Sequence, residues 1–141
     1  MIHKSGKSHH DVTLGPWQKR ALYAATLLLW LTGVLWLCLP PWQSLAMRIH
    51  GAAAMGFLMV FGSLLIHHVP QGWSQSRQRP SGSLLVSLSS VLIVTGWGLY
   101  YVVDRGLREW TGKVHWILGL IFPALIVLHI FLGRRANSEK K

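Results

Sequence analysis

The sequence is poor in cysteine, in acidic residues and in charge altogether. Of its 141 residues, one is cysteine (Cys38) and four are Asp or Glu. A single cysteine excludes a disulfide framework within the chain and every motif that needs paired cysteines. Charged residues make up 13% of the chain and apolar residues 51%. This balance is unusual for a soluble domain and is typical of a membrane protein.

Basic residues dominate the few charges that are present. Lys and Arg number 14, which gives a formal net charge of +10. Such an excess is found in nucleic-acid-binding proteins, and it is also found at membrane surfaces. Here the basic residues lie mainly at the ends of apolar runs and in the two tails. The pattern favours membrane lipid as the partner, and we do not expect nucleic acid to be one.

Four apolar runs are long enough to cross a bilayer as helices, at about residues 20–39, 47–69, 83–103 and 113–133. They predict an all-α fold, a membrane four-helix bundle with up-down-up-down topology over residues 20–135. We expect residues 1–19 and 136–141 to be tails, and we find no secretory signal peptide in the first of them. Pro40–Pro41 and Pro70 are expected to end the first two spans, and Pro123 to kink the last.

The distribution of Lys and Arg predicts the orientation. Ten of them fall on the side that carries both tails and four on the other. The positive-inside rule therefore puts both termini in the cytoplasm of a bacterial cell, with the protein in the inner membrane. The ten are Lys4, Lys7, Lys19, Arg20, Arg77, Arg79, Arg134, Arg135, Lys140 and Lys141, and the four are Arg48, Arg105, Arg108 and Lys113.

Histidines inside the second and fourth spans are the main indication of function, because polar residues in a membrane are costly and rare. His50 lies near the start of the second span, and His67 and His68 lie at its end. The fourth span has His115 near its start and His129 near its end. These two spans run in the same direction, so His50 shares a membrane depth with His115, and His68 shares the opposite depth with His129.

Helical phase supports this pairing. The 18 residues from His50 to His68 make about five turns, and the 14 from His115 to His129 fall about 40° short of four. The two levels are then roughly 21 to 27 Å apart along the helix axes. Tilt or local distortion must absorb the difference between 18 and 14, which leaves His67 open as the alternative to His68.

Two facing imidazoles at each of two levels match the needs of b-type haem, which takes two axial nitrogens and no covalent link. A zinc site would need more ligands at each level, and no Cys, Asp or Glu lies nearby. We therefore expect His50 and His115 to bind one haem iron on the outer side, and His68 and His129 another on the cytoplasmic side. A proton or cation path, and purely structural histidines, are the alternatives. We assign no catalytic residue.

Several neighbouring residues fit a haem site. Small residues such as Gly51, Gly56 and Gly119 would leave room for the macrocycle. Arg48 near His50, and Arg77 and Arg79 near His68, are expected to bind propionates at the membrane surface. The segment Thr95–Gly98 has two glycines around a tryptophan. It indicates either close approach of a bulky group or ordinary packing of small residues.

Some of these motifs resemble those of known families. They are H-G-A-A-A-M and H-H-V-P in the second span, T-G-W-G-L-Y-Y in the third, and H-W-I-L-G-L and L-H-I-F-L-G in the fourth. They resemble the DUF4405 class of small bacterial four-helix membrane proteins. That class is related to the di-haem cytochrome b561-like proteins and to the cytochrome b subunits of nickel–iron hydrogenase and formate dehydrogenase. The resemblance covers roughly residues 20–135 and implies His50, His68, His115 and His129 as ligands.

The resemblance implies electron transfer across the membrane. We expect an electron relay between the quinone pool and a redox protein partner, and an electron-transfer subunit rather than a stand-alone enzyme. A self-contained oxidoreductase that couples superoxide to quinone, as in the cytochrome b561 type, is one alternative, and a haem-free membrane scaffold or transporter is another.

Overall fold

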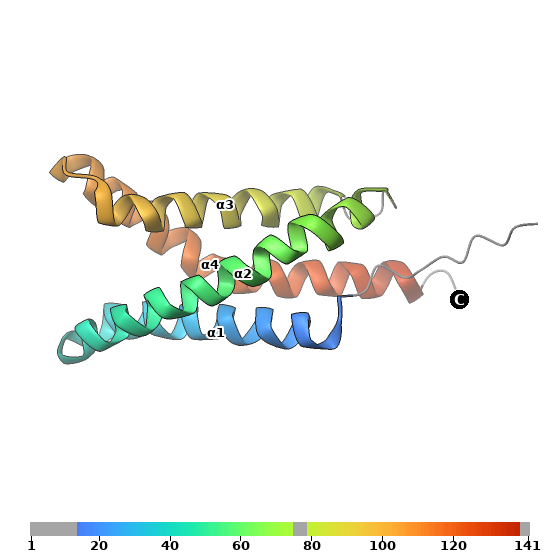
Figure 1. The fold of residues 1–141 in the computed structure, drawn as a ribbon, viewed down its shortest axis with the longest axis horizontal. Coiled ribbons are helices and arrows are strands. Elements are labelled where there is room, and N and C mark those ends of the chain that lie inside the picture. Colours follow the sequence, from blue (N-terminus) through green and yellow to red (C-terminus); the bar gives the residue numbers. More distant parts are fainter. Residues whose placement is uncertain (1–13, 75–78, 139–141) are drawn as a thin grey trace, which may run out of the picture.

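The computed structural model describes residues 14–74 and 79–138, and these are almost wholly helical. The elements are α1 (Pro16–Cys38), a short 3-10 turn η1 (Pro40–Trp42), α2 (Gln43–Ser74), α3 (Arg79–Tyr101) and α4 (Arg105–Ser138). All four α-helices are long and apolar enough to cross a membrane. The described part of the chain is therefore all-α, and its helices lie together as a four-helix bundle (Figure 1).

The helices pack as two hairpins. α1 lies mainly against α2, and α3 lies mainly against α4, while α1 also contacts α4 and α2 contacts α3. Each hairpin closes through a short connection. In the first hairpin, Pro40 and Pro41 lie in the turn between α1 and α2. In the second, Asp104 caps the start of α4 by accepting a hydrogen bond from the Leu107 amide at 2.7 Å. An aspartate at this position satisfies a backbone donor that has no partner within the helix.

The helices extend beyond the predicted spans. α1 begins at Pro16, because a proline suits the first position of a helix, so residues 16–19 are helical and not part of a tail. α2 continues through Pro70 to Ser74, so the prediction that Pro70 ends the second span is wrong. A proline removes one backbone hydrogen bond, and a membrane helix tolerates that loss. The segment after Asp104 is the first part of α4, which runs unbroken through Pro123 to Ser138.

A small aromatic core lies between the two histidine levels of both long helices. Phe57 and Phe61 on α2 pack with Phe122 and Ile126 on α4, and all four are buried. The Phe57 and Phe61 rings stack at 5.8 Å, and the Phe57 and Phe122 rings meet edge-on at 6.0 Å. In sequence, the two phenylalanines of α2 fall between His50 and His68, and Phe122 falls between His115 and His129. The core therefore joins side chains of α2 and α4 at the centre of the bundle, where residues of α1 and α3 also pack against it, and it separates the two histidine levels.

Most other apolar side chains face outward. Met59 is 73% exposed, Ile66 71% and Val127 65%, and each spanning window has few buried residues. A soluble bundle would bury such an apolar stripe on each helix. Exposed apolar faces on every helix are instead what lipid contact requires. With the four spanning helices, they make this a multi-pass membrane protein.

Candidate functional site: the histidine pairs

The structure brings His50 of α2 and His115 of α4 together. Their ring centroids are 6.2 Å apart and the ring planes meet at 70°. Both side chains are half-buried, on the inner faces of their helices. Two rings from the two different hairpins thus face one another near the connections Leu39–Trp42 and Val102–Asp104.

His68 and His129 form the second pair, toward the other ends of α2 and α4. Both are half-buried, and the two side chains are near enough to interact electrostatically. His67 is exposed. Successive residues of a helix are turned by about 100°, so only one of two adjacent histidines can face the partner helix. In this structure the inward one is His68.

Three of these four rings have a hydroxyl partner on the neighbouring helix. Nδ1 of His50 is 2.9 Å from Thr32 Oγ1 of α1. Nδ1 of His115 is 3.0 Å from Thr95 Oγ1 of α3, and Nδ1 of His129 is 2.9 Å from Ser81 Oγ of α3. In the described residues, no such hydroxyl partner is seen for His68.

A glycine follows each of these hydroxyl residues and lies against the same ring. A Cβ on Gly96 would be 3.1 Å from His115 Cε1, which is too close without a shift of the ring. A Cβ on Gly33 or Gly82 would be 3.9 Å from Cε1 of His50 or His129, an ordinary contact. The bulky group that approaches Gly96 is therefore the His115 ring. The hydroxyl–glycine pairs Thr32–Gly33, Ser81–Gly82 and Thr95–Gly96 form part of the wall beside the histidines.

The three hydroxyl residues were not among the site residues predicted from the sequence. The sequence spacing of two of them, Ser81 and Thr95, could have indicated their role. Ser81 and Thr95 are 14 residues apart on α3, as are His115 and His129 on α4. In an antiparallel hairpin, equal spacings place both members of one set beside both members of the other.

The predicted propionate-binding arginines lie in different surroundings. Arg48, two residues before His50, is exposed. Arg79 donates from Nε to the Trp73 carbonyl at 2.9 Å, and its guanidinium lies 5.4 Å from the Trp73 ring centroid. Arg77 lies outside the described residues.

Comparison with known proteins identifies the family. A family model for prokaryotic cytochrome b561 matches residues 62–138, which is more than half of the chain. The chain belongs to the prokaryotic cytochrome b561 family. The matched region includes α3, α4 and the end of α2, and so contains every site histidine except His50. No curated protein and no solved structure gave a match.

Membership of the cytochrome b561 family confirms that part of the resemblance, while the narrower DUF4405 class stays a prediction. It implies b-type haem and a role in membrane electron transfer. The residues fit this group. Two metal–nitrogen bonds of about 2 Å and two ring radii set the centroids of coaxial imidazoles roughly 6 Å apart, close to the 6.2 Å between His50 and His115. In the described part of the chain, no three His, Cys, Asp or Glu residues gather to hold a bare ion. Haem needs only two protein ligands.

Proposed function

We propose that this cytochrome b561 family member binds two b-type haems, each between two histidines, and relays electrons across the bilayer. The observation that carries the proposal is the His50–His115 pair, whose ring centroids are 6.2 Å apart, close to the separation expected of two imidazoles that share one iron. His68 and His129 are the proposed ligands of the second haem. His67 is the less suitable alternative, because its side chain is exposed.

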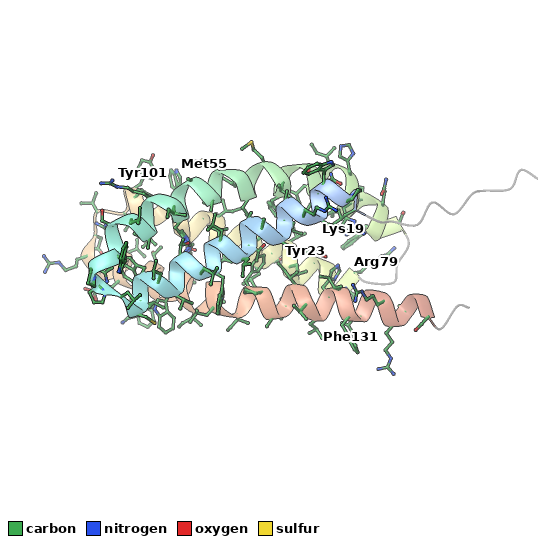
Figure 2. The ribbon with its side chains drawn as sticks, turned by 90° about the horizontal axis from the view of Figure 1, so that it is seen from below. Lys19, Tyr23, Met55, Arg79, Tyr101 and Phe131 are labelled. Atoms are coloured by element: carbon green, nitrogen blue, oxygen red, sulfur yellow. The ribbon has the colours of Figure 1, made fainter. Side chains whose placement is uncertain are left out.

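The proposed topology is up-down-up-down with both termini in the cytoplasm. It rests on the ten-to-four distribution of Lys and Arg between the two sides. Lys19 and Arg79 lie at one end of the bundle and Tyr101 at the other (Figure 2). In this orientation the His50–His115 pair is on the outer side and the His68–His129 pair is on the cytoplasmic side.

When bound, the two haems supply one-electron redox chemistry at two depths of the membrane. His50 with His115, and His68 with His129, would hold the two haems at these depths. Two histidine ligands leave no open position for oxygen or substrate, and this favours electron relay over reaction at the metal. The buried aromatic core between the levels keeps the two sites apart and excludes water from the space between them.

Cations at the membrane surfaces are the proposed propionate partners. Arg48 would serve the outer site, and Arg77 and Arg79 the cytoplasmic one. Arg48 is exposed and free to reorient. Arg79 makes its hydrogen bond to the Trp73 carbonyl through Nε, and its guanidinium has two further nitrogens of the kind that could donate to a carboxylate.

The test is haem content with ligand substitutions. The purified protein, expressed with ample haem, is measured by reduced-minus-oxidised absorption and by haem per polypeptide from the pyridine derivative. We expect two b haems in the wild type and one in His50→Ala or His115→Ala. One haem in the wild type would mean that one pair has another role, and none would refute the proposal. Retention of both haems in either variant would refute the pairing.

The quinone pool and a redox protein are the proposed electron donor and acceptor. Family membership suggests this class of partner. The self-contained superoxide:quinone activity predicts a saturable rate with those two reactants alone. A relay subunit instead requires a co-purifying protein for turnover, and reconstitution with and without that protein distinguishes the two.

A further inference from the structure

We infer that Thr32 and Thr95 are positioning residues that fix the tautomer and orientation of His50 and His115, respectively. In this way they tune the reduction potential of the haem that the two histidines would hold. This inference rests on the proposed haem at that site. The threonines come from α1 and α3, while the histidines come from α2 and α4. Each hairpin therefore brings both a ligand and the group that orients it.

The hydrogen bonds of Thr32 assign the proton on His50. The Thr32 hydroxyl donates its single hydrogen to the Leu28 carbonyl, 2.7 Å away, with the Leu29 carbonyl at 3.1 Å as a second acceptor. A hydroxyl has one hydrogen, so toward His50 Nδ1, at 2.9 Å, Thr32 Oγ1 can only accept. Nδ1 of His50 therefore carries the hydrogen.

Thr95 repeats this arrangement at His115. Its hydroxyl donates to the Val91 carbonyl at 2.7 Å, with the Leu92 carbonyl at 3.2 Å. Oγ1 is thereby left to accept from His115 Nδ1 at 3.0 Å. In its neutral form each ring thus carries its hydrogen on Nδ1. The lone pair that binds a metal is on Nε2 in both.

A glycine packs beside each of the two histidine rings. The residue after each threonine, Gly33 or Gly96, lies against the same ring that the threonine holds. At Gly96 the approach is close enough that a Cβ would lie 3.1 Å from His115 Cε1, and the ring would have to move by a few tenths of an ångström to accommodate it. The ring is therefore fixed by a hydrogen bond at one edge and by packing beside it, which restricts its rotation about the Cβ–Cγ bond.

Such support has an electronic consequence. When Nδ1–H donates to an oxygen, the ring becomes more basic and gives more electron density to a metal on Nε2. Greater donation stabilises ferric over ferrous iron and lowers the reduction potential. Loss of either threonine hydroxyl should therefore raise the potential of one haem, the one between His50 and His115.

Three groups of variants test this in the full-length protein. Thr32→Val and Thr95→Val remove only the hydroxyl, and Thr32→Ser restores it. Thr26→Val is the matched control, because Thr26 is a buried threonine of α1 whose Oγ1 has no hydrogen-bond partner in the described structure. The readouts are haem content, the midpoint potentials of the two one-electron components, and the ferric low-spin electron paramagnetic resonance spectrum.

We expect both valine variants to raise the midpoint of the same component, by up to about 59 mV, which corresponds to a tenfold change in the ferric-to-ferrous equilibrium. Its resonance spectrum should change as well. Thr32→Ser and Thr26→Val should match the wild type. If Thr32→Val instead loses that haem, retention of haem in Thr32→Ser supports the inference and loss in both overturns it.

Failure of this inference is distinguishable from failure of the proposed function. A wild-type protein without haem refutes the proposed function. A wild type with two haems, whose midpoints and resonance spectrum are unchanged in both valine variants, overturns only the role of the threonines. Valine variants that shift different components also overturn it, because Thr32 and Thr95 would then not act on one haem.

Discussion

At the scale of single residues, two adjacent histidines on α2 have different surroundings. His68 is half-buried and interacts with His129, whereas His67 is exposed. We predict that His68→Ala lowers the haem content from two per chain to one, because a metal on His129 would keep only one axial ligand. His67→Ala should keep both haems, since its ring faces away from the bundle. Haem per polypeptide and the reduced spectrum measure this difference.

The pair of variants is its own control, because the two changes are the same in chemistry and one position apart. Loss of a haem in His67→Ala together with retention of both in His68→Ala would show that His67 is the ligand. Such a result would require α2 to rotate by about 100° relative to α4.

The sequence was enough to predict which polar residues inside the membrane form the site. It was only partly enough to predict which side chains hydrogen-bond to them. Histidine is costly in lipid, so His50, His115 and His129 stood out at once. The threonines did not, because a helical threonine satisfies its own hydroxyl through a backbone carbonyl in the preceding turn and is inexpensive in a membrane. That Thr32 and Thr95 also reach a histidine depends on how closely the helices of each hairpin pack.

At the scale of the helix, the unequal histidine spacings have a geometric reason. The 18-residue interval on α2 covers about 27 Å of helix, and the 14-residue interval on α4 covers about 21 Å. α2 runs obliquely across the bundle (Figure 1), so more of its length is needed to cross the same depth. Tilt of α2 is thus the feature that lets both pairs form. The sequence predicts that some adjustment is needed, but tilt depends on packing.

Helix ends were the least predictable part of the fold. The apolar spans were visible because lipid contact requires apolar residues. Helical hydrogen bonding, however, continues into polar segments where the composition changes. The region after Asp104, which lies between the third and fourth predicted spans, is the first part of α4 for this reason. Likewise, the apolar run of the second span stops at Pro70, but the α2 helix continues to Ser74.

The aromatic core between α2 and α4 is the element-scale determinant of stability. We predict that Phe122→Ala, which leaves a cavity beside Phe57, lowers the free energy of unfolding by about 2 kcal/mol. This is less than the 3–5 kcal/mol of soluble cores, because lipid tails are as apolar as the core and only the packing is lost. Unfolding of the detergent-solubilised protein by sodium dodecyl sulfate measures it. Met59→Ala, at a 73% exposed position, is the control and should change stability little.

Both haem sites should respond to Phe122→Ala, because the core lies between the two histidine levels. We expect the two haems to be lost at a lower temperature than in the wild type, whereas Met59→Ala should not alter that temperature. Loss of one haem alone would contradict a shared core. An unfolding free energy equal to that of the wild type would show that α2 and α4 are held together elsewhere.

At the scale of the whole molecule, the surface combines apolar sides with unequal ends. Exposed leucine, isoleucine, valine and methionine side chains occur along all four helices. Basic residues concentrate where α1 begins, where α2 meets α3 and where α4 ends, as Lys19 and Arg79 illustrate (Figure 2). The apolar sides require lipid. We propose that the basic end lies on the cytoplasmic side, because placing it outside would require carrying those charges across the membrane.

The single cysteine allows a direct test of this orientation. Cys38 is exposed at the end of α1, opposite the basic end of the bundle. We predict that a membrane-impermeant maleimide labels it in intact spheroplasts, because the proposed topology puts that end outside. Cys38→Ser should abolish labelling. Adding Ser138→Cys to Cys38→Ser moves the thiol to the end of α4, where labelling should require lysis. The reverse pattern, with an unchanged haem spectrum to show that the variants are folded, would invert the topology and exchange the outer and cytoplasmic assignments of the two histidine pairs.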